Sequence, residues 1–132
     1  ANEKPRPVSF DMPARTSSKA MVLNDPEAPY TMVQVIGNSK YSKKATTVGE
    51  YVDDLKENLF NAMMAARLEE LKNSPNPPFI FSAGGFNEGF ARGWKNFQLL
   101  AICGNDKIEA ATDAIVKESL KSYNFFGSSF KA

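Results

Sequence analysis

The chain of 132 residues contains no histidine and a single cysteine, Cys103. Zinc and copper sites in proteins are built mainly from imidazole and thiolate ligands. We therefore expect no such site within these residues, and the Ser-His-Asp and Cys-His catalytic arrangements are excluded. One cysteine also rules out a disulfide within the chain, so cysteine usage does not indicate a compartment.

A strong excess of charge and a long apolar run are absent as well. The net charge is +1, which gives no field for attracting nucleic acid or an anionic membrane. No stretch approaches the ~20 apolar residues that a bilayer-spanning helix needs, and no D-x-[DN]-x-[DN]-G calcium loop is present. With 42% hydrophobic and 23% charged residues, the composition is that of one globular domain over residues 1–132.

Prolines and polar residues dominate the first part of the chain. Residues 1–18 form a proline-rich lead-in, in which Val8–Phe10 is a candidate edge strand. Lys19–Leu23 is a second strand candidate, and the Asn-Asp-Pro sequence that follows predicts a turn. Tyr30–Ile36 alternates with period two and contains β-branched residues, which predicts a strand.

A long helix is predicted to begin at Thr47, because Thr47-x-x-Glu50 fits a capping box. Its apolar residues fall into two stripes that are wider together than a surface helix needs. The first stripe comprises Val48, Val52, Leu55, Leu59, Met63 and Ala66, and the second comprises Phe60, Met64, Leu68 and Leu71. We expect this helix to lie between a sheet on one side and another body on the other.

The sequence after this helix predicts two strands and a second helix. Pro75, Pro77 and Pro78 must end the first helix. Ile80–Gly85 is a predicted strand whose paired glycines indicate a bulge or a close backbone approach. Trp94–Cys103 is predicted to be a central strand, with its apolar second half covered on both faces.

Asn105 is the predicted N-cap of the last helix, with Glu109 in its first turn. Together these elements predict an α+β fold of two layers, in which a mostly antiparallel sheet is covered on one face by two helices.

The sequence LFNAMMAARLEELKNSPNPPFIFSAGGF resembles the non-catalytic repeat of the pitrilysin/insulinase family of zinc peptidases, the inverzincins. In that family a long helix leads through a proline-rich turn into a strand rich in small residues and then a hairpin. Several positions match the helix and the turn: Leu59, Met63, Arg67, Leu68, Leu71, Pro77, Pro78 and Phe79. The acidic turn at Asp25–Glu27 and the aromatic tail at Tyr123–Phe126 also fit, so the resemblance covers roughly residues 18–130.

The resemblance implies a metallohydrolase-like unit that lacks the metal and lines a chamber around a peptide substrate. In the family, zinc and the H-x-x-E-H motif belong to a separate catalytic domain. The chain would then be a truncated fragment of a longer peptidase, its partners the other domains of that chain and the peptide. By analogy with this family, the resemblance implies that such a protein is located in the periplasm or elsewhere outside the cytoplasm.

Arg67 and Phe79 are the candidate substrate contacts that the resemblance implies. Some family members place an arginine and a tyrosine near the substrate, and Phe79 lacks the tyrosine hydroxyl. The alternative for Arg67 is an ion pair with Glu70 or a favourable interaction with the helix dipole. Cys103 ends an apolar run and is predicted to be a buried, inert thiol.

Two further classes of function remain as alternatives. One is a free-standing α+β module for binding or dimerisation, unrelated to peptidases. The other is a sheet that stacks RNA bases on Trp94 and neighbouring phenylalanines. The near-neutral charge disfavours the second, and core packing explains the aromatic residues.

Overall fold

The computed structural model describes residues 16–40, 47–91 and 93–129, and confirms the α+β class. The predicted edge strand at Val8–Phe10 lies outside these residues. The elements in chain order are β1 (Thr31–Lys40), α1 (Val48–Lys72), β2 (Phe81–Ala91), β3 (Trp94–Cys103), the short 3-10 helix η1 (Asn105–Lys107) and α2 (Ile108–Ser129).

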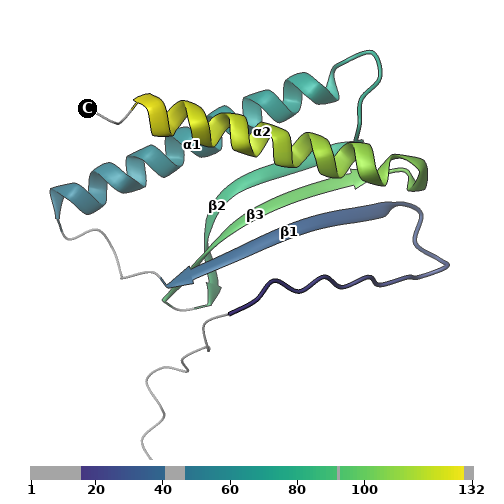
Figure 1. The fold of residues 1–132 in the computed structure, drawn as a ribbon, viewed down its shortest axis with the longest axis horizontal. Helices are drawn as coiled ribbons and strands as arrows, with labels where there is room; N and C mark the ends of the chain where they lie inside the picture. Colours follow the sequence, from purple (N-terminus) through teal and green to yellow (C-terminus); the bar gives the residue numbers. More distant parts are fainter. Residues whose placement is uncertain (1–15, 41–46, 92, 130–132) are drawn as a thin grey trace, which may run out of the picture.

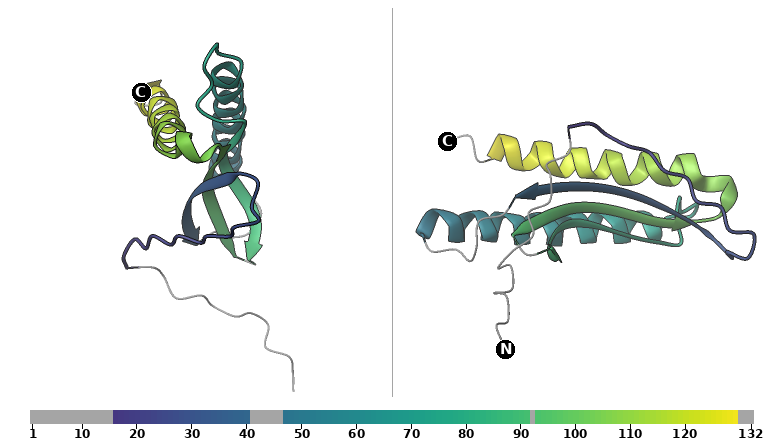
Figure 2. Two further views of the ribbon diagram at one scale, coloured as in Figure 1. Left: turned by 90° about the vertical axis from the view of Figure 1, so that its right-hand side faces the viewer. Right: turned by 90° about the horizontal axis from the view of Figure 1, so that it is seen from below.

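The three strands form one antiparallel sheet in the order β1-β3-β2. Because β3 pairs antiparallel with both neighbours, β1 and β2 run parallel to each other, and α1 connects them as a split β-α-β unit. Both helices lie on the same face of the sheet, which gives two layers (Figures 1 and 2). None of the helices in the described residues lies on the other face of the sheet.

The strand predicted at Lys19–Leu23 is absent, and this prediction is wrong. Residues 16–30 contain a turn but no strand. The turn is held by the amide of Ala28, which donates to the carbonyl of Asp25 over 3.1 Å. The amide of Glu27 donates to Asp25 Oδ1 over 3.0 Å. The strand predicted at Tyr30–Ile36 does form, as β1, and it continues to Lys40.

The capping box at the start of α1 is confirmed. Thr47 Oγ1 accepts a hydrogen bond from the Glu50 amide over 3.2 Å, and Glu50 Oε2 accepts one from the Thr47 amide over 3.0 Å. The helix ends at Lys72, before Pro75, as predicted. The amide of Asn73 closes the last turn by donating to the carbonyl of Glu69 over 3.1 Å.

The hydrophobic core lies between the helices and the sheet. Its buried members are Phe60, Met64, Leu68, Phe79, Leu99, Ala101, Cys103, Ala111 and Ile115. The rings of Phe60, Phe86 and Phe97 pack against one another, with centroids 5.1 to 6.0 Å apart. The second predicted stripe of α1 therefore supplies the core residues of this helix, and α2 contributes Ala111 and Ile115.

Strand β3 is central, as predicted, but its second half is covered on one face only. Leu99, Ala101 and Cys103 point into the core, whereas Leu100 and Ile102 are half-buried on the face without helices. The prediction of cover on both faces is therefore wrong. Helices α1 and α2 both lie on the core face, so a helical layer on the second face would have to come from other elements.

Candidate functional site

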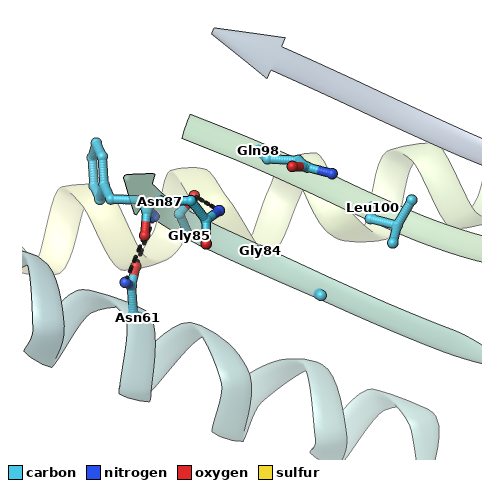
Figure 3. A pocket seen from close by; sticks show the side chains of 8 residues that line it. Asn61, Gly84, Gly85, Asn87, Gln98 and Leu100 are labelled. Carbon is cyan, nitrogen blue, oxygen red and sulfur yellow. Dashed lines mark hydrogen bonds between the residues drawn. The ribbon is translucent and has the colours of Figure 1, made fainter. Parts of the chain in front are cut away.

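The side chain of Asn61 joins α1 to the outer edge of β2. Its Nδ2 donates to the Phe86 carbonyl over 2.9 Å, and its Oδ1 accepts from the Phe86 amide over 2.8 Å (Figure 3). Asn61 thus replaces the peptide group of a missing neighbouring strand at this point of an edge strand. Gly85 allows the approach, because its φ is 152° and an added Cβ would lie 2.3 Å from Asn61 Oδ1.

A cleft of about 320 Å³ lies beside this contact, over β2 and β3. Its polar groups are backbone and the carboxamides of Asn61, Asn87 and Gln98, and Leu100 supplies an apolar wall (Figure 3). No lining residue is titratable, so the cleft offers neutral hydrogen-bond donors and acceptors but no general acid or base. It is suited to a neutral polar group such as a peptide bond.

Arg67 forms an ion pair with α2 instead of with Glu70. Its Nε lies 2.7 Å from Glu118 Oε2, and Lys121 Nζ lies 2.6 Å from the other oxygen of the same carboxylate. Burial disfavours the charged form of Glu118, but the hydrogen bonds from Lys121 and Arg67 outweigh it and hold the pKa of that carboxyl below its usual value. The observed role of Arg67 is therefore to join the two helices.

Phe79, the second predicted substrate contact, is only 2% exposed and belongs to the core. The described conformation thus brings neither predicted residue into the cleft of Asn61. Contact of Arg67 or Phe79 with a substrate remains a prediction to which the geometry adds no support.

Apart from its end at the Lys40–Trp94 pair, the face of the sheet without helices carries no charged residue among the paired positions and is largely apolar. Residues that share this face through the strand pairing are Met32, Gln34, Ile36, Asn38, Phe81, Ala83, Asn87, Asn96, Gln98, Leu100 and Ile102. Met32 is 55% exposed and Phe81 47%. The Oδ1 atoms of the paired residues Asn38 and Asn96 are buried without a hydrogen-bond partner, which is a costly arrangement unless a donor reaches them.

The first predicted stripe of α1 faces solvent. Val48 is 80% exposed, and Val52, Leu55 and Leu59 are each between 40% and 51% exposed. At 100° per residue the centre of this stripe lies roughly 140° around the helix from the centre of the buried stripe. Helix α1 therefore has one apolar side in the core and a second that is half exposed or more.

The described residues do not fit a zinc site. No group of three or more Cys, Asp or Glu side chains is gathered in residues 16–40, 47–91 and 93–129, and the sequence has no histidine. Cys103 is buried, and burial followed by the nearby Asp106 carboxylate raises the pKa of its thiol. A thiol in this state is a poor nucleophile, in line with the predicted inert role.

Asn61 and Glu118 are the site residues that sequence reasoning missed. Each is a polar residue that contacts an element far along the chain, 25 and 51 residues away respectively. The signal for Asn61 was present, since an asparagine beside the buried stripe of a helix needs a partner. The signal for Glu118 was a lone acid on the apolar side of the last helix.

No protein-family model matches the chain, and no curated protein or solved structure matches it. Within the described part of the chain, neither helix has the length and apolar character needed to cross a membrane.

Proposed function

We propose that this chain is a non-catalytic, metallohydrolase-like domain of a zinc peptidase, and that it walls the chamber in which a peptide is processed. The observation that carries the proposal is the second apolar side of α1, which faces away from the core and is half exposed or more. A helix with apolar residues on two sides is suited to packing between two bodies. In the proposed assembly the second body is another domain of the same parent chain.

A further observation supports this reading. The segment that resembles the peptidase family, Leu59–Phe86, comprises the C-terminal half of α1, the turn with the prolines and the first residues of β2, in the order that the resemblance implies.

Zinc and the catalytic motif would belong to another domain of the parent protein, since the sequence has no histidine and the described residues gather no set of metal ligands. This chain would contribute shape and hydrogen bonds, with a peptide as the substrate of the assembly. A location outside the cytoplasm is part of the same proposal and rests on the resemblance.

The proposal is tested first on the gene. A complete reading frame that includes this segment should also encode H-x-x-E-H. The full-length protein should contain zinc and hydrolyse peptides. A complete reading frame without that motif, or a full-length protein without peptidase activity, would contradict the proposal.

A matched pair of variants in the full-length protein tests the role of α1. Leu55→Asp places a charge in the exposed stripe, and Leu120→Asp places the same charge on an exposed apolar position of α2. We expect Leu55→Asp to lower peptidase activity and thermal stability because it breaks a domain contact. Leu120→Asp should leave both nearly unchanged. Equal effects of the two variants would show that the exposed stripe of α1 makes no special contact, and would contradict the proposed packing against another domain.

A free-standing dimerisation module is the second candidate, favoured by the same exposed stripe. Val48, Val52, Leu55 and Leu59 of this stripe are all at least 40% exposed. In a symmetric pair, the stripe of one copy would pack against the same stripe of the other. Dimers of the isolated chain that Leu55→Asp abolishes in sedimentation experiments would favour this candidate.

A further inference from the structure

Strand β1 lies at the border of the sheet, and only β3 pairs with it (Figure 1). The amide of Ile80, just before β2, donates to the carbonyl of Ile102 over 2.7 Å, so the backbone groups of Ile102 point toward β2. Met32 opposes Ile102, and in an antiparallel ladder its own backbone groups therefore point away from β3. The same alternation directs to the free edge the backbone groups of Gln34, Ile36 and Asn38. In the described part of the chain, nothing hydrogen-bonds to these backbone groups.

The edge of β1 lacks the features that protect edge strands from pairing, which are bulges, prolines, charged residues and covering groups. The register of β1 is uninterrupted from Thr31 to Lys40, and the charged residue of the strand, Lys40, stands at its end. Residues 16–30, which precede the strand, contain no strand of their own, are exposed throughout and form no hydrogen bond with β1. An unprotected edge of this kind is available to a further strand.

The opposite edge of the sheet, on β2, is protected. Asn61 occupies both backbone groups of Phe86 through hydrogen bonds of 2.8 and 2.9 Å. The register of β2 also shifts between Glu88 and Ala91, which marks an irregularity of the strand, and Glu88 places a charge beside it. Each molecule therefore has one edge open to pairing and one that resists it. Pairing between copies can then end at two instead of continuing as a growing series of sheets.

We propose that β1 pairs antiparallel with β1 of a second copy, so that the two three-stranded sheets form one continuous sheet around a two-fold axis. This inference goes beyond the proposed function and does not depend on it, since it concerns contacts between copies of this chain. The free edge is self-complementary when the axis passes beside Gln34. The backbone groups of Gln34 then exchange hydrogen bonds with those of Gln34 in the second copy, and those of Met32 with those of Ile36 in the second copy.

The side chains are compatible with this register. The carboxamide of Gln34 can both donate to and accept from the same carboxamide of the second copy. Met32, which is 55% exposed, would lie opposite Ile36, which is 42% exposed, on the face without helices. Val33 would lie opposite Val35 on the face that carries the helices. No charged residue is among these positions, so the pairing covers apolar side chains without bringing like charges together.

The test is the oligomeric state of the 132-residue chain in sedimentation equilibrium, with Gln34→Lys as the disrupting variant. Gln34 is exposed, so the folded monomer should tolerate the substitution, but in a dimer the two new charges would lie directly opposite each other. Asn87→Lys is the matched control, because it places the same charge at an exposed position of the other edge strand. Circular dichroism checks that each variant is folded.

We expect the wild type and Asn87→Lys to form dimers, and the dissociation constant of Gln34→Lys to be at least about tenfold higher. Mild oxidation should link two copies of Gln34→Cys, because the Cα atoms of a hydrogen-bonded antiparallel pair lie about 5.5 Å apart, within the reach of a disulfide. Cys103 is buried and should not contribute to this link.

A wild-type chain that remains monomeric at ~1 mM, where even weak association is detected, would overturn the proposal. A dimer that Gln34→Lys leaves intact, and that Leu55→Asp abolishes, would also overturn it, because that dimer would use the exposed stripe of α1. Equal weakening by Gln34→Lys and Asn87→Lys, or no cross-link in Gln34→Cys, would show that β1 does not meet its copy in this register and would overturn it too. Growth into species larger than a dimer would contradict the closure at two copies.

Discussion

Helix α1 carries two apolar stripes, and the structure buries only one of them. Phe60, Met64 and Leu68 lie against the sheet and α2, whereas Val48 and Leu59 face solvent. Both stripes have the spacing that predicts a core-facing helix side. The difference shows that periodicity identifies surfaces able to be buried, but does not state which of them this chain buries by itself.

The largest effect expected from this comparison is that of Met64→Asp. Met64 is fully buried, so the new carboxylate would be unpaired in the core, and we expect a loss of about 4 kcal/mol or more in the free energy of unfolding. Leu59→Asp, at a position 51% exposed, should change it by less than about 0.5 kcal/mol. Urea denaturation measures both. A large effect of Leu59→Asp would show that the outer stripe is buried within the isolated chain.

Gly85→Ala should come next, because it disturbs the contact that seats α1 on the edge of β2. The new Cβ would meet Asn61 Oδ1, and the positive φ would be strained. We expect a loss of about 2–3 kcal/mol. Gly37→Ala is the matched control on β1, where the nearest atom to an added Cβ is 4.0 Å away. Thermal unfolding that is equally affected by both substitutions would contradict the role given to Asn61.

Glu118→Gln probes the pairing of α1 with α2 and should cost about 1–2 kcal/mol at neutral pH, since one charged hydrogen-bond partner is lost. The folded-state pKa of Glu118 lies below its ordinary value of 4.5. Its stabilisation is therefore complete above pH 4.5 and is lost as the pH falls through the lower folded-state pKa.

Consequently, the free energy of unfolding should decrease less steeply with falling pH in Glu118→Gln than in the wild type. The control is Asp113→Asn, which removes the exposed pair with Lys117 and should have little effect. Identical acid profiles of Glu118→Gln and the wild type would show that the carboxylate contributes nothing to the helix contact.

The smallest of these effects is expected for the cap of α1, which lies next to the exposed stripe. Thr47→Ala removes one side of the capping box and should cost about 1 kcal/mol. Thr112→Ala, inside α2, should cost less, because its hydroxyl bonds only to the carbonyl of Ile108 in its own helix. Circular dichroism during urea unfolding resolves this difference.

Local signals predicted the helix and strand pattern well, and nonlocal partners were the source of the errors. The capping box and the prolines fixed the ends of α1 because both act within a few residues. The predicted strand at Lys19–Leu23 failed in the structure because a strand needs a partner, which lies outside the segment itself. The ion pair predicted between Arg67 and Glu70 failed for the same reason, since the actual partner, Glu118, comes from another helix.

The sequence by itself determined the elements of this protein and excluded histidine-based chemistry, because helix caps, strand alternation and the residue inventory are properties of short segments. The tertiary structure alone decided which stripe of α1 enters the core, how Asn61 covers the edge of β2 and that Glu118 joins the two helices. Those outcomes depend on contacts between residues 25 or more positions apart, and such contacts exist only once the chain has brought them together.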